Sequence, residues 1–84
     1  MLAAARDGIA DVLDAERVEW RDGRAVDTSA VLPDDGPLAE VVIVDAPPAG
    51  HFVVTGSRAD VPPEHRRTAR LVAATAARWL TRGV

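Results

Sequence analysis

The chain has no cysteine and very few aromatic residues. Disulfides, thiolate nucleophiles, iron–sulfur clusters and cysteine-ligated zinc are therefore excluded within its 84 residues. Aromatic residues make up 4% of the chain, so we expect Trp20, Phe52 and Trp79 to be the large side chains of the core. Residues 1–84 are enough for one domain with one core, built mostly from Val, Ile, Leu and Ala.

Lysine is also absent, and the ten basic side chains, all arginine, are outnumbered by 13 acidic ones. The net charge of −3 argues against nucleic-acid binding, which needs a basic surface. Every apolar run is far shorter than the ~20 residues that span a bilayer. Residues 2–5 are followed at once by Arg6 and Asp7, unlike a signal peptide. We expect a cytoplasmic domain with no membrane insertion.

Hydrophobic periodicity predicts two helices, one near each end of the chain, over residues 1–14 and 63–82. Pro63 suits the first helical position, and Gly83 is a typical stop. The apolar face expected for the second helix consists of Thr68, Ala69, Val72, Ala73, Ala76, Trp79 and Leu80. The opposite, solvated face is expected to carry Arg66, Arg67, Arg70, Arg78 and Arg82.

Strands are predicted over residues 16–21, 24–28, 40–45 and 51–57. Asp22-Gly23 is a two-residue hairpin signal between the first two strands. Prolines and Gly36 make residues 29–39 a loop. The sequence thus predicts an α+β fold: a four-stranded antiparallel sheet with the N- and C-terminal helices packed on one face, in two layers.

Three segments resemble the C-terminal half of GAF domains: VVIV (41–44), FVVTGS (52–57) and VPPEHRR (61–67), followed by an alanine-rich helix. The segment LDAERVEW (13–20), after the first helix, is similar to the first GAF strand. The resemblance implies one GAF-like domain of the kind found in actinobacterial signalling proteins. It implies a regulatory or sensory role through self-association or partner binding in signal transduction.

The chain departs from the GAF pattern in three respects. Residues 28–39 are too few for the central helices that roof a GAF ligand pocket, so a minimal domain is implied. Pro62 stands where Ser or Thr caps the last helix, and no cysteine is present for bilin attachment. Two alternatives remain open: a small-molecule-binding module with a shallow pocket under the 28–39 loop, and a roadblock-like dimerisation domain.

No catalytic motif is recognisable in the sequence, so we expect neither enzymatic activity nor a cofactor. The two histidines, His51 and His65, form no His-x₃-His metal pair, and we interpret both as partly exposed polar residues. Asp34 and Asp35 lack the alternating spacing of a calcium loop, and turn formation before Gly36 explains them.

Apolar residues on both faces of the 40–45 and 51–57 strands indicate an interface, because two helices can cover only one face. The uncovered face is expected to be either Val42, Val44, Val53 and Thr55, or Val41, Ile43, Phe52 and Val54. A second candidate surface surrounds Leu71, which lies among Arg67, Ala74 and Arg78 on the last helix. We expect a homodimer, or contact with another signalling domain, through one of these two surfaces.

Overall fold

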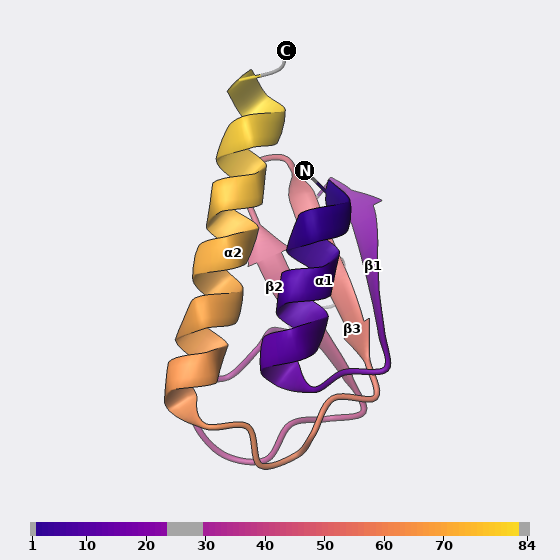
Figure 1. Ribbon diagram of the computed structural model, residues 1–84, viewed down its shortest axis with the longest axis vertical. Helices are drawn as coiled ribbons and strands as arrows, with labels where there is room; N and C mark the ends of the chain where they lie inside the picture. The colour runs from indigo at the N-terminus through magenta and orange to yellow at the C-terminus, as the bar shows by residue number, and fades with distance from the viewer. Residues whose placement is uncertain (1, 24–29, 83–84) are drawn as a thin grey trace.

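The computed structural model describes residues 2–23 and 30–82, which form a helical layer on a sheet (Figure 1). The helices are α1 (Leu2–Leu13) and α2 (Pro63–Arg82). The strands are β1 (Arg17–Asp22), β2 (Val41–Ala46) and β3 (Gly50–Thr55). The helices lie side by side, run in opposite directions and cover the same face of the sheet, so the predicted α+β class is confirmed. Neither helix is long and apolar enough to cross a membrane.

The sheet formed by the described residues has three strands in the order β1-β3-β2, and both strand pairs are antiparallel. The predicted four-stranded sheet is therefore wrong. The strand expected over residues 24–28 lies outside the described residues. Gly23, directly after β1, has a φ of 83°. This left-handed conformation is the one that glycine adopts most readily, as the Asp22-Gly23 turn pattern predicts.

The register brings one residue from each strand into rows beneath the helices. Val18 of β1 and Val42 of β2 both pair with Val54, and Trp20 and Val44 both pair with Phe52. The Trp20 and Phe52 rings meet edge to face, with centroids 4.9 Å apart. From α1, the buried side chains Ala5, Ile9 and Leu13 complete this core.

The same register corrects the predicted composition of the sheet faces. Val42 and Val44 share the helix-covered face with Phe52 and Val54, and all four are buried. Both predicted sets combined residues from opposite faces, because the periodicity of each strand says nothing about the pairing between strands. The face away from the helices carries Val41, Ile43, Val53 and Thr55.

Trp20 requires a glycine at position 50, which pairs with Asp22 on the neighbouring strand. A Cβ atom at Gly50 would lie 2.3 Å from the Arg21 carbonyl oxygen and 2.6 Å from Cζ2 of Trp20. Both approaches are far inside van der Waals contact, so only glycine allows the indole to lie across the start of β3.

α2 packs on the sheet mainly through small side chains. Ala69, Ala73, Ala76 and Ala77 are buried, whereas Trp79 is 55% exposed. The prediction that Trp79 belongs to the core is therefore wrong. Figure 1 shows that the C-terminal turns of α2 extend past the N-terminal end of α1, so no helix covers them there.

Two arginines near the start of α2 hold the loop that precedes β2. Arg66 is only 3% exposed and donates hydrogen bonds to the carbonyl oxygens of Val61 (2.9 Å), Pro33 (3.2 Å) and Gly36. Arg70 donates to the Leu32 carbonyl (2.6 Å) and pairs with Asp34. The expectation of a solvated arginine face is thus wrong for Arg66, because loop carbonyls with no strand partner need donors.

This loop also contributes to the core and to the edge of the sheet. Leu32 and Leu38 are buried among the helix-facing side chains. The Leu32 amide donates to the Ile43 carbonyl (2.9 Å), and Val31 forms a parallel bridge with Ile43. The loop therefore lies along the outer edge of β2 and beneath α2, where it covers part of the core.

The exposure of Trp79 predicts a small stability effect. We expect Trp79→Ala to lower the free energy of unfolding by less than ~1 kcal/mol, as for most surface substitutions. Phe52→Ala, at the centre of the core, should cost about 3–5 kcal/mol. Urea denaturation followed by circular dichroism measures both, and a large loss for Trp79→Ala would contradict its exposed position.

The burial of Arg66 predicts that Arg66→Met lowers the free energy of unfolding more than Arg70→Met does. Arg66→Met keeps the volume but leaves three carbonyl groups without their charged donor, so it should cost about 3 kcal/mol. Arg70→Met is the matched control, because that side chain is partly exposed and its ion pair should contribute ~1 kcal/mol or less. Equal losses in the same denaturation experiment would show that Arg66 has no special role.

Candidate interaction surface

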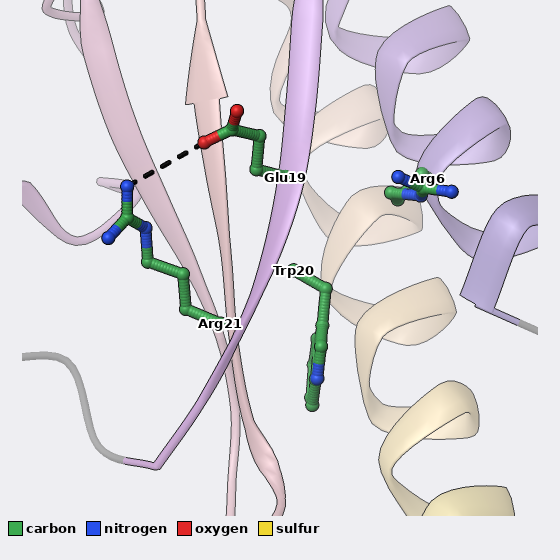
Figure 2. Close-up of a pocket in the computed structure, with 4 residues that line it drawn as sticks. All are labelled: Arg6, Glu19, Trp20 and Arg21. Carbon is green, nitrogen blue, oxygen red and sulfur yellow. Dashed lines mark ion pairs between the residues drawn. The ribbon is translucent and has the colours of Figure 1, made fainter.

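The side chains that line the hollow beside β1 do not converge on a common point. It has a volume of about 520 Å³ and is lined by Arg6, Glu19, Trp20 and Arg21. Figure 2 shows Trp20 on the side of β1 that faces Arg6, and the Glu19–Arg21 ion pair (3.6 Å) on the opposite side. The Trp20 indole nitrogen donates to Asp22 (3.0 Å). Because these side chains diverge, they form no convergent ligand site.

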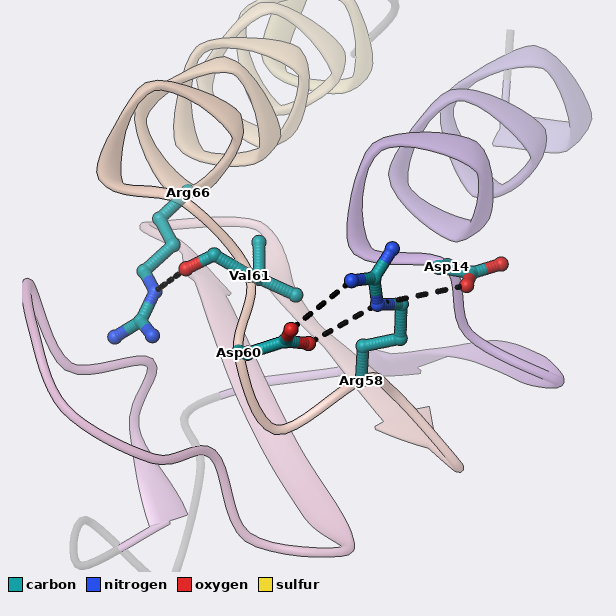
Figure 3. Close-up of polar contacts among 5 residues, drawn as sticks. All are labelled: Asp14, Arg58, Asp60, Val61 and Arg66. Atoms are coloured by element: carbon teal, nitrogen blue, oxygen red, sulfur yellow. Dashed lines mark hydrogen bonds and ion pairs between the residues drawn. The ribbon is translucent and has the colours of Figure 1, made fainter.

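A polar cluster of Asp14, Arg58 and Asp60 lies at the C-terminal end of α1, beside the segment that leads into α2 (Figure 3). Arg58 donates two hydrogen bonds of 3.0 Å to Asp60, and its Nε lies 3.9 Å from Oδ2 of Asp14. The Arg58 amide donates to the Leu13 carbonyl (3.3 Å), one of the last carbonyls of α1. A basic side chain at this end of a helix also complements the helix dipole. The cluster thus joins the segment before α2 to the C-terminus of α1.

This cluster shifts the protonation of its two main members. The hydrogen bond and the positive charge of Arg58 hold the pKa of Asp60 below its ordinary value. In return, the hydrogen bond and charge of Asp60 raise the pKa of Arg58. Both side chains are exposed, so the pair is a surface contact rather than a buried, activated acid.

The hollow around the cluster offers no metal-binding arrangement in the part of the chain described. Its volume is about 410 Å³, and its lining includes Asp11, Asp14, Asp60 and His65. Among the described residues, no three His, Asp or Glu side chains are placed to hold an ion together. His65 is exposed as predicted, whereas His51 is 7% exposed and donates from Nδ1 to the Gly23 carbonyl (2.9 Å).

A third hollow lies beside the 30–39 loop, near the predicted shallow pocket. It measures about 460 Å³ and is lined by residues 35–37, 59–63 and Arg66; its two carboxylates, Asp35 and Asp60, already accept hydrogen bonds from Gly36 and Arg58. Arg66 is its one basic side chain, and the hydrogen bonds that Arg66 makes to loop carbonyls already orient it. The hollow therefore offers a ligand few side-chain groups that are not already engaged.

The outer surface of the helical layer is different, because it carries an apolar patch around Leu71. Leu71 on α2 is 68% exposed, the largest exposed fraction of any large hydrophobic side chain in the described part of the chain. Beside it, a groove of about 300 Å³ runs between the helices. The groove is lined by Ala4, Ala5, Thr68, Leu71, Val72, Thr75 and Ala76. An apolar groove next to an exposed leucine is typical of a protein–protein contact surface.

The threonines of this groove add to its apolar character. The Thr75 hydroxyl donates to the Leu71 carbonyl (2.8 Å), and the Thr68 hydroxyl donates to the Glu64 carbonyl (3.0 Å). Each hydroxyl is bonded to its own helix, so it does not require a partner in the groove. A partner could therefore cover both threonines without losing a hydrogen bond.

The predicted interface residues divide between surface and core. Leu71, Ala74, Arg67 and Arg78 are all exposed on α2, on one continuous part of the helix. Val42 and Val44 are buried beneath the helices and offer no surface to a partner, while Val53 lies half-buried on the opposite sheet face.

The sequence interpretation missed three features of the helix surface. Thr68 and Trp79, expected on the core face of α2, are exposed, and Ala4, absent from the predicted interface, lines the groove. A signal was present in the four alanines at 69, 73, 76 and 77, whose helical spacing defines a core face centred away from Trp79.

The Arg58–Asp60 contact predicts the titration of one carboxyl group. An NMR titration should find the pKa of Asp60 below that of an ordinary aspartate, and Arg58→Gln should return it toward the ordinary value. The depressed pKa means that the contact stabilises the fold at neutral pH and is lost as pH falls through the pKa of folded Asp60. A midpoint unchanged by Arg58→Gln would exclude the contact in solution.

Comparisons with known proteins complete the description of this surface. No protein-family model matches the chain, and no curated protein or solved structure matches it.

Proposed function

We propose that this chain is a non-enzymatic regulatory domain, similar to GAF domains, that acts by self-association in cytoplasmic signal transduction. The observation that carries the proposal is the exposed Leu71 beside the apolar groove between α1 and α2. A leucine that is 68% exposed leaves most of its hydrocarbon in water, and covering it in a dimer is favourable by the hydrophobic effect.

The arrangement of the helices supports the proposal. α1 and α2 turn one side to the sheet, and their outer sides together form a surface on which a second molecule can pack. The GAF resemblance agrees with this, because GAF-like domains are expected to pair through their terminal helices. A signal that changes such pairing in one part of a protein can be transmitted along the terminal helix.

The opposite sheet face supports self-association less well. Val41 is 43% exposed there, but Arg17, Glu19 and Arg21 occupy the same face on β1. Glu19 forms ion pairs with both of these arginines. Covering this face would remove those charges from water, which costs free energy unless a partner pairs with them.

Sedimentation velocity at micromolar concentration tests the proposal. We expect a dimer for the natural sequence and a monomer for Leu71→Asp, with a dissociation constant raised at least about tenfold, or ~1.4 kcal/mol. Val41→Asp is the matched control, since it places the same charge at an exposed apolar position on the sheet face.

Three outcomes would contradict this expectation. A natural sequence that sediments as a monomer would refute self-association, and a dimer lost with Val41→Asp but retained with Leu71→Asp would place the contact on the sheet. Binding to a different signalling domain, with no homodimer, would also overturn it. Circular dichroism and melting curves confirm that both variants are folded.

A further inference from the structure

Three exposed residues of α2 form a line with Leu71 at its centre. Glu64 precedes Leu71 by seven residues, and Arg78 follows it by seven. Seven residues make nearly two helical turns and rise about 10 Å, so the three side chains leave the helix in almost the same direction. The line therefore runs from an acidic end through an apolar centre to a basic end.

The two charged ends have no ion-pair partner among the described residues. No hydrogen bond or ion pair involves the side chain of Glu64 or Arg78 there, although other arginines are engaged. Arg58 and Arg70, for example, each pair with an aspartate. Glu64 and Arg78 are thus available to a partner, on the same line as the exposed leucine.

We propose that the partner is a second copy of this chain whose α2 crosses the first in the antiparallel direction, with Leu71 at the two-fold axis. A two-fold contact places the same surface of both molecules against itself. In the antiparallel direction, Leu71 then contacts the partner's Leu71 at the centre. Each Glu64 contacts the other molecule's Arg78, so the interface has one such contact on either side of the axis. This inference rests on the proposed self-association and adds its geometry.

Charge decides between the two possible directions. A parallel pair aligned on Leu71 would bring Glu64 to the partner's Glu64 and Arg78 to the partner's Arg78. Like charges in contact oppose association, whereas the antiparallel pair forms two opposite-charge contacts.

The groove beside the line suits close contact. Alanines and threonines form most of its lining, and the threonine hydroxyls are bonded to their own helix. Small side chains allow two helix axes to approach to about 8–10 Å. The partner's Leu71 can then lie at the groove rather than in water.

Cysteine cross-linking tests the direction of α2 in the dimer. The chain has no cysteine, so Glu64→Cys and Arg78→Cys each carry a single thiol. We expect a mixture of the two variants to form a disulfide-linked pair under mild oxidation, and each variant alone to form little. Cross-linking of each variant with itself, and not in the mixture, would establish a parallel pair and overturn the proposal.

Charge exchange tests the same geometry without disulfides. Glu64→Arg and Arg78→Glu should each raise the dissociation constant at least tenfold, and the double variant should return it to within about threefold of the natural value. A parallel pair would show no such recovery, because the double variant only exchanges one like-charge contact for another. Arg6→Glu is the control for net charge, since it makes the same change at an exposed arginine of α1 that borders the hollow beside β1 and lies away from the line.

These outcomes separate the two proposals. A natural sequence that never dimerises defeats the proposed function and this inference together. A dimer that Leu71→Asp disrupts, but whose double charge variant does not recover, leaves the proposed function intact and overturns only the antiparallel arrangement. Melting curves of each variant show whether a weaker dimer reflects the contact or an unfolded monomer.

Discussion

The close packing of α2 on the sheet is the constraint on which the rest of the structure depends. Ala69, Ala73, Ala76 and Ala77 are the buried apolar side chains along this helix, so its backbone lies near the strands. Small side chains leave no space beneath the helix for a leucine or an indole of the same helix. Leu71 is consequently on the outer surface, and the core receives its large side chains from Phe52, Ile9 and Leu13 instead.

Close packing also determines how the loop before β2 is held. The core needs further apolar volume at the edge of β2, and Leu32 and Leu38 provide it. Placing these leucines beneath α2 brings loop carbonyls into a region with few backbone donors, and Arg66 supplies them. The buried Arg66 guanidinium therefore satisfies carbonyl groups that would otherwise lack a donor.

The candidate function follows from the same geometry. Because α2 contacts the sheet through alanines, Leu71 is turned outward, and it lines the groove formed with α1. The charged side chains that line the other hollows either point apart, as around Trp20, or are already engaged in internal contacts, as around Arg58. The helix surface is thus the part of the described molecule whose apolar area and charges remain available for binding.

The sequence by itself determined the α+β class, the positions of both helices and of three strands, and the exposure of Leu71, because these depend on local periodicity. It did not determine which faces of β2 and β3 belong together, since strand register arises only when the strands pair. Nor did it reveal that Arg66 is buried and Trp79 exposed. The alanines at 69, 73, 76 and 77 indicate a face of small side chains, but only the packing against the sheet shows that this face alone forms the buried contact. The tertiary structure therefore decided both, because that packing fixes the rotation of α2 about its axis, which leaves Trp79 exposed and brings Arg66 to the loop carbonyls.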